Sequence, residues 1–177
     1  MERLPDEASS GMSHGREAKH LPVVAVGVDG SAGSREALQW AIAEARLRDV
    51  PLRAIHAWTY VQPLIPSLIG YPYSAEYVDS TNDERQKAAE RLLEHVTAAL
   101  ADAHEIEIER VTAEGPAARV LIDAVGEDDL LVVGSRGHGG FSSLLLGSVS
   151  QQCAHHAPCP VVIVRGTNTS NARQGVS

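Results

Sequence analysis

Leu130-Leu131-Val132-Val133 is a short apolar run that opens into Gly134-Ser135-Arg136-Gly137-His138-Gly139-Gly140, and the pair Gly147-Ser148 follows soon after. The run predicts a buried strand, and glycines after it let the backbone approach an anion without a Cβ in the way. Ser148, with Gln151 three residues on, predicts the N-cap of a capping box. The helix starting there would direct free N–H groups and its positive dipole end at the loop, which indicates an anion site.

Strand and helix patterns alternate along the rest of the chain. Strands are predicted at Pro22–Val28, Leu52–Trp58, Glu105–Val111, Leu130–Val133 and Val161–Val164, and helices from Ser31 or Ser34 to Arg48, Thr81 to Ala103, Pro116 to Gly126 and Ser148 to His156. This order predicts a single-domain α/β fold, with a five-stranded parallel sheet and helices on both faces, as in Rossmann-like proteins. Ligands of such sheets bind at the carboxyl ends of the strands, where Asp29 and Gly134 would lie.

Periodicity adds finer predictions about the helices and strands. The first helix should bury one face, formed by Leu38, Ala41, Ile42 and Ala45. Thr81 with Glu84 predicts a capping box for the second helix, after an irregular Pro- and Tyr-rich connection over Thr59–Val78. The apolar stripe of that helix should be Ala88, Ala89, Leu92, Val96, Ala99 and Leu100. Glu105–Val111 alternates acidic and aliphatic residues, which indicates a strand at a sheet edge.

Composition excludes several classes of protein. The 177 residues are 44% hydrophobic and 21% charged, as expected of one globular domain, and the net charge of -8 argues against a surface for nucleic acid or an anionic membrane. Residues 1–20 lack the apolar core of a signal peptide and should be a disordered tail, as should residues 166–177. No run approaches the length of a membrane span, and two cysteines make no disulfide framework. The expected location is the cytoplasm.

The glycine pattern can be written as Gly, two residues, Gly, nine residues, Gly-Ser, and it fits Gly134, Gly137, Gly147 and Ser148. It resembles the nucleotide-binding signature of the universal stress protein family, in its ATP-binding branch. Three further segments agree in order, namely Val26–Ser31, Ala54–Ala57 and His156–Val162. The resemblance covers about Leu21 to Arg165, which predicts a universal stress protein domain over residues 21–165 with a fold similar to the adenine nucleotide alpha hydrolases.

Candidate site residues come from the loop and from the resemblance. The open, basic loop itself contributes Gly134, Ser135, Arg136, Gly137, His138, Gly139, Gly140 and Gly147 as anion-binding candidates. The resemblance implies that Asp29 contacts adenosine, that the backbone of Ala57 contacts adenine, and that Ser148 and Val149 contact phosphate through their backbone. Asp29 could instead only cap the first helix, and Gly27 could serve either ligand approach or packing.

Other sites are less well supported by the residues. The chain lacks the G-x-G-x-x-G spacing of a dinucleotide site after its first strand and the Lys of a Walker A loop before Ser148. Cys153, His155, His156 and Cys159 do not have the paired spacing of a zinc site, so we expect Cys153 to pack and the histidines to lie at a helix C-terminus. His56 should be a core histidine with a satisfied hydrogen bond.

The expected function is that of a cytoplasmic stress-response regulator whose main activity is to bind ATP, with or without Mg. The residues leave two alternatives open, a slow ATPase and a dimeric interaction module with a vestigial nucleotide site. Pro160–Val164 is aliphatic and uncharged, so a homodimer through this last strand is predicted. If His138 faces phosphate, nucleotide should bind more tightly as the pH falls through the pKa of its imidazole.

Overall fold

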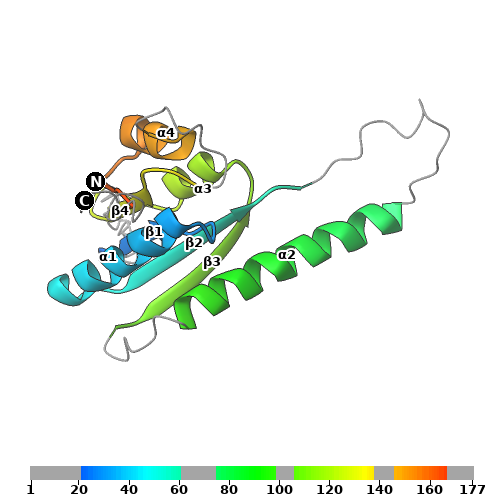
Figure 1. Ribbon diagram of the computed structural model, residues 1–177, viewed down its shortest axis with the longest axis horizontal. Coiled ribbons are helices and arrows are strands. Elements are labelled where there is room, and N and C mark those ends of the chain that lie inside the picture. Colours follow the sequence, from blue (N-terminus) through cyan, green and yellow to red (C-terminus); the bar gives the residue numbers. More distant parts are fainter. Residues whose placement is uncertain (1–20, 61–74, 99–105, 138–145, 167–177) are drawn as a thin grey trace, which may run out of the picture.

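The computed structural model describes residues 21–60, 75–98, 106–137 and 146–166. Five strands and four helices alternate along these ranges (Figure 1). In chain order they are β1 (Val24–Gly27), α1 (Ala32–Arg48), β2 (Leu52–Trp58), α2 (Ala75–Ala98), β3 (Ile108–Glu114), α3 (Ala117–Asp123), β4 (Leu130–Gly134), α4 (Ser148–His156) and β5 (Val161–Val164). The predicted α/β architecture is confirmed.

The strands form one parallel sheet in the order β3-β2-β1-β4-β5. The chain builds outward from β1 to β3 and then returns to place β4 on the other side of β1, where Val24 pairs with Leu130. This reversal leaves a crevice at the carboxyl ends of β1 and β4. β3 and β5 form the two edges, so both predicted edge strands are confirmed.

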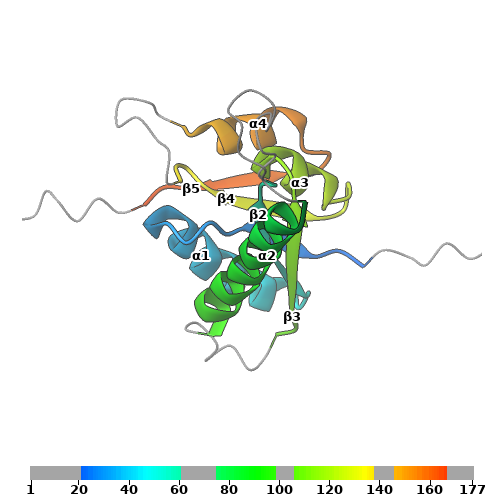
Figure 2. The same cartoon turned by 90° about the vertical axis from the view of Figure 1, so that its right-hand side faces the viewer.

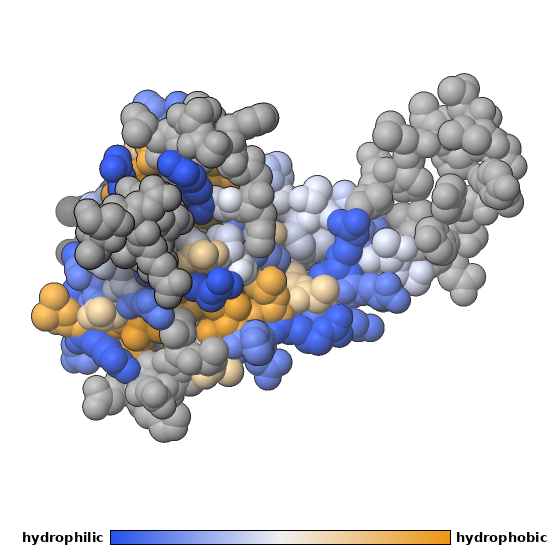
Figure 3. Space-filling model, in the orientation of Figure 1, coloured by the Kyte–Doolittle hydropathy of each residue, from blue (hydrophilic) through white to orange (hydrophobic). Residues whose placement is uncertain are grey.

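The core has two layers, one on each face of the sheet. The helices α1 and α2 pack on one face around Val26, Leu38 and Leu93, and α3 and α4 cover the other face around Leu121 and Leu131 (Figure 2). The predicted inner face of α1, formed by Leu38, Ala41, Ile42 and Ala45, is buried. Figure 3 shows hydrophobic side chains reaching the surface in a band beside α1, whose Leu47 is 81% exposed.

The second helix begins earlier than predicted. It starts at Ala75, so the capping box at Thr81 and Glu84 is wrong, and Ala75–Val78 is helix rather than irregular connection. The physical reason is that neither Pro nor Gly interrupts residues 75–98, so the helix continues upstream of its best local cap. The helix also buries Leu93 beside Ala89 and Val96, whereas the predicted stripe residue Ala88 is exposed. Ala99 and Leu100 lie outside the described residues.

The third strand lies three residues later in the chain than predicted. It runs over seven residues that pair in register with all seven of β2, from Leu52 with Ile108 to Trp58 with Glu114. The pairing partner, and not the acid–aliphatic alternation, sets the bounds of this edge strand. The tails predicted at residues 1–20 and 167–177 lie outside the described residues. Among the described helices, none is both long enough and apolar enough to cross a membrane.

Candidate functional site

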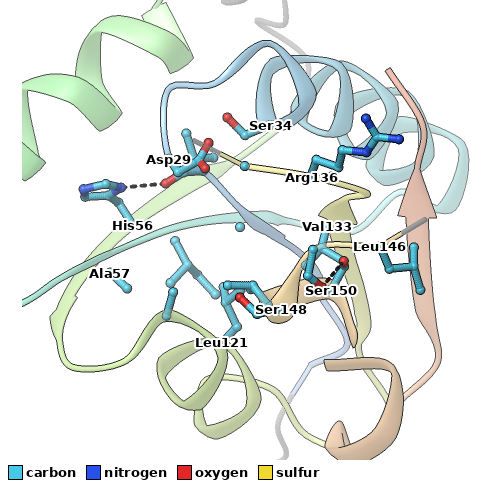
Figure 4. Close-up of a pocket in the computed structure, with 18 residues that line it drawn as sticks. Asp29, Ser34, His56, Ala57, Leu121, Val133, Arg136, Leu146, Ser148 and Ser150 are labelled. Carbon is cyan, nitrogen blue, oxygen red and sulfur yellow. Dashed lines mark hydrogen bonds between the residues drawn. The ribbon is translucent and has the colours of Figure 1, made fainter. Parts of the chain in front are cut away.

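A cavity of about 680 Å³ lies at the carboxyl ends of β1, β2 and β4 (Figure 4). The N-terminal parts of three helices border it, through Ser34 of α1, Ala117 of α3 and Ser148 of α4. This volume is in the range typical of small-molecule sites. The cavity therefore occupies the position where an open parallel sheet of this order binds its ligand.

Most of the predicted site residues that the structure describes line this one cavity. They are Gly27, Asp29, Ala57, Gly134, Arg136, Gly137, Gly147, Ser148 and Val149. Ser135 does not line the cavity and is buried. His138, Gly139 and Gly140 lie outside the described residues. Residues from β1, β2, β4 and α4, far apart in the sequence, are thus brought together.

Part of the cavity lining is apolar. It is formed by Ile55, Ala117, Leu121 and Val133 together with Gly27. A Cβ on Gly27 would lie 2.9 Å from Cδ1 of Leu121, so this glycine serves packing as well as access to the cavity. Ala117 and Leu121 were not predicted as site residues, because an apolar residue on a helix gives no local signal that it contacts a ligand.

The turn after β1 is held by its own side chains. Oδ1 of Asp29 accepts a hydrogen bond from the N–H of Ser31 at 2.9 Å. The hydroxyl oxygen of Ser31 in turn accepts from the N–H of Ser34 at 3.2 Å, which makes Ser31 the N-cap of α1. Asp29 also lines the cavity, so its carboxylate both organises this turn and faces the space where a ligand would lie.

Hydrogen bonds join the two ends of the loop that follows β4. The backbone N–H of Ser135 donates to the carbonyl of Val164 at 2.7 Å, and its own carbonyl accepts from the N–H of Gly147 at 2.7 Å. The hydroxyl of Ser150, which is 1% exposed, lies 3.2 Å from the carbonyl of Ser135 and 2.9 Å from that of Gly147. Ser150 therefore contacts the backbone at both ends of the loop.

The predicted capping box of the fourth helix is wrong. The N-cap is Gly147, with φ −74° and ψ 162°, and no side chain caps the first turn. Ser148 is instead the first helical residue, and the N–H of Gln151 donates to the carbonyl of Gly147. The first N–H groups of α4 are thus left without a side-chain cap at the cavity wall, which strengthens the case for an anion there.

Two glycines let the first turn of α1 lie in close contact with the end of β4 and the residues after it. A Cβ on Gly134 would lie 2.9 Å from the backbone of Gly33, and a Cβ on Gly33 would lie 2.7 Å from the carbonyl oxygen of Arg136. Contacts this short with backbone cannot be relieved by turning a side chain. Gly33 was missed in the sequence because nothing in α1 alone shows that a second backbone passes there.

The other two loop glycines have different surroundings. A Cβ on Gly137 would collide with Oδ2 of Asp29, whereas a Cβ on Gly147 would find its nearest atoms at 3.5 Å, an ordinary contact. Left-handed φ values among the described residues belong to Gly30, Asp49 and Gly115, so neither loop glycine is required for its φ. Gly137 thus leaves room for the Asp29 carboxylate.

The remaining polar side chains of the cavity are His56 and Arg136. Nδ1 of His56 lies 2.6 Å from the carbonyl oxygen of Val28, which confirms that this histidine has a hydrogen-bond partner. The prediction of a core position is wrong, because His56 is half-buried and lines the cavity. Arg136 is exposed, and Figure 4 shows its side chain extending away from His56 and Ala57. The described lining therefore has one carboxylate, one imidazole and one guanidinium.

Cys153, Cys159, His155 and His156 are divided between the core and the surface. Burial raises the pKa of the Cys153 thiol to about 11 and also raises the pKa of Cys159. His155 and His156 are exposed in the last turn of α4, so the predicted packing of Cys153 and the helix-end position of the histidines are confirmed. Within the described ranges, no three His, Cys, Asp or Glu residues gather as metal ligands would.

Comparison with known sequences gives a clear match. Residues 22–165 match the universal stress protein family. The chain is also 35% identical over 143 residues to a universal stress protein of Mycolicibacterium smegmatis, in an alignment that covers 81% of this chain and 48% of the relative. The chain spans about half the length of the curated relatives that it matches.

Solved structures share the fold. A universal stress protein in complex with cAMP superposes with a TM-score of 0.58 at 25% identity, covering 82% of this chain and 98% of that one. A universal stress protein family protein of Arabidopsis thaliana with AMP bound has a TM-score of 0.56 at 20% identity, covering 84% and 94% of the two chains. The Rossmann-like architecture is therefore shared.

Proposed function

This chain belongs to the universal stress protein family, and from that premise we propose that it binds an adenine nucleotide, with ATP as the expected ligand, and that binding is its main activity. The observation that carries the proposal is the first turn of α4, which faces the cavity with no side-chain cap. Free N–H groups and the positive end of the helix dipole favour phosphate there. The solved relatives with cAMP and AMP support the same class of ligand.

The lining of the cavity suits the parts of a nucleotide. The apolar side chains of Leu121 and Ile55 match the faces of a base, and the backbone of Gly147 and Ser148 at the start of α4 matches the phosphates. Asp29, on the turn after β1, also lines the cavity and can accept hydrogen bonds from ribose hydroxyls. It is the only carboxylate among the described lining residues, so any Mg²⁺ would depend mainly on the oxygens of the nucleotide.

Binding rather than hydrolysis is favoured by the bonds of the two candidate bases. Asp29 accepts from the N–H of Ser31, and His56 contacts the carbonyl of Val28. Each group thus already serves the turn after β1, and a slow ATPase remains the second possibility. The role of a stress-response regulator is proposed from the family alone.

The experiment that tests this proposal starts with the purified full chain. We expect adenine nucleotide to be released on denaturation and to be identified by absorbance and chromatography. Calorimetric titration of nucleotide-free protein should then show saturable binding of ATP and weaker binding of GTP. Absence of any adenine nucleotide in the preparation, together with no heat of binding for ATP, AMP or cAMP at millimolar concentration, would contradict the proposal.

We also propose that the chain forms a homodimer through β5. All four residues of this edge strand, Val161–Val164, are aliphatic and only half-buried. The other edge, β3, exposes Glu109, Arg110 and Glu114, which oppose strand pairing. Sedimentation should give a dimer at micromolar concentration and a monomer for Val162→Lys. A wild-type monomer under these conditions would overturn this part of the proposal.

A further inference from the structure

The parallel pairing of β1 with β2 stops one hydrogen bond short of the cavity. The register ends at Gly27 with Ile55, and the N–H of Val28 donates to the carbonyl of Ile55 at 2.8 Å. In a continuing parallel ladder the next bond would run from the N–H of Ala57 to the carbonyl of Val28. The hydrogen bonds between these described strands do not include that one.

The carbonyl of Val28 instead accepts a hydrogen bond from a side chain. Nδ1 of the half-buried His56 lies 2.6 Å from this oxygen. A carbonyl oxygen can only accept, so Nδ1 carries the proton and donates. Figure 4 shows this bond at the edge of the cavity, next to Asp29 and on the same strand as Ala57.

The missing bond leaves the backbone of Ala57 directed toward the cavity. The carbonyl of Trp58 accepts from the N–H of Gly115, so Trp58 faces β3. Successive residues of a strand point their backbone groups to opposite sides, and Ala57 therefore faces the β1 side. There β1 has already ended and the chain turns away at Gly30, whose φ is 83°. Ala57 is accordingly part of the cavity lining.

We propose that His56 is a positioning residue for recognition of the base, an inference that rests on the proposed nucleotide binding. By donating to the carbonyl of Val28, its imidazole keeps the ladder open, so the N–H of Ala57 remains available to a ring nitrogen of a bound purine. A simple structural role would predict something different. In that case His56 would only anchor two strands, and its loss would lower stability without changing the state of the Ala57 amide.

The test measures hydrogen exchange of the Ala57 amide by NMR, first without nucleotide. In the wild type this amide should exchange at least about tenfold faster than that of Ile55, which lies within the ladder. In His56→Leu the carbonyl of Val28 is released, the Ala57 bond forms, and exchange should slow at least tenfold. In His56→Asn the side-chain amide can still donate to Val28, so the exchange should stay near the wild-type rate.

Either of two results would overturn the inference. One is a wild-type Ala57 amide as protected as that of Ile55, which needs no variant to be measured. The other is equal Ala57 exchange in the wild type and His56→Leu when both are folded by circular dichroism.

Affinity measurements with two ligands distinguish a failure of the role of His56 from a failure of the proposed nucleotide binding. His56→Leu should bind AMP about tenfold more weakly than the wild type but bind ribose 5-phosphate, which lacks the base, equally well. An equal loss for both ligands would contradict a role in base recognition. If the wild type binds neither ligand, the proposed function fails, while the apoprotein exchange rates still decide whether His56 keeps the ladder open.

Discussion

The N-terminal parts of three helices border the cavity, and two of them, α1 and α4, are capped in opposite ways. At α1 the hydroxyl of Ser31 caps the N–H of Ser34, and Asp29 accepts from the N–H of Ser31 itself. At α4 the N-cap is Gly147, and no side chain caps the turn. An anion competes with side chains at the first helix but not at the second. The contrast supports the proposal that the phosphate end of a ligand lies at α4 rather than at α1.

The largest effect is expected where the end of β4 crosses the first turn of α1. Gly134→Ala would place a Cβ 2.9 Å from the backbone of Gly33, so we expect a loss of stability of roughly 1–3 kcal/mol or more, because neither backbone can turn aside. Urea denaturation measures this loss of stability. Gly147→Ala is the matched control, since its Cβ has 3.5 Å of room, and its stability should change by less than about 0.5 kcal/mol. Equal losses in the two variants would contradict the described crossing.

A smaller effect is expected at Ser150, which contacts both ends of the loop before α4. Ser150→Ala removes a buried hydroxyl whose single proton is shared between the carbonyls of Ser135 and Gly147, so the free energy of unfolding should fall by about 1–2 kcal/mol. Ser148→Ala, two residues away on the same helix, should leave stability nearly unchanged because Ser148 caps nothing. The stabilities of the two variants are compared by thermal unfolding. A larger loss of stability in Ser148→Ala than in Ser150→Ala would indicate that Ser148 does cap α4, against the structure.

The smallest effect is expected at the capped helix. Ser31→Ala removes the side-chain cap of α1 and should cost about 1 kcal/mol of stability. Because the proposed phosphate site is at α4, ATP affinity in calorimetry should change by less than about twofold, provided that the turn at Asp29 stays in place. A drop in affinity as large as that of a substitution at Gly147 would mean that both helix ends bind the anion.

The comparison of the two ends also shows what sequence can predict. The alternating pattern and the inner face of α1 were sufficient for the fold, because both depend on local periodicity. The cap at Ser31 was predicted as one of two serines, whereas Ser148 was misassigned since a serine three residues before a glutamine fits a capping box wherever it stands. Gly33, Leu121 and Ser150 could not be found this way, because their roles depend on chain segments distant in sequence.

The central claim is that the first turn of α4 is the anion site, and one pair of substitutions tests it most directly. Gly147→Asp and Gly147→Asn would each supply the side-chain cap that α4 lacks, in a position with room for a Cβ, and should leave stability unchanged or raise it by a few tenths of a kcal/mol. They differ only in charge.

Calorimetric titration with ATP should therefore show the wild type binding most tightly, Gly147→Asn more weakly, and Gly147→Asp at least about tenfold more weakly than Gly147→Asn at low salt. The gap between the two variants should narrow as ionic strength rises, because salt screens the repulsion between carboxylate and phosphate. Equal ATP affinity in the two variants, while the wild type binds ATP, would place the phosphates elsewhere and contradict the account.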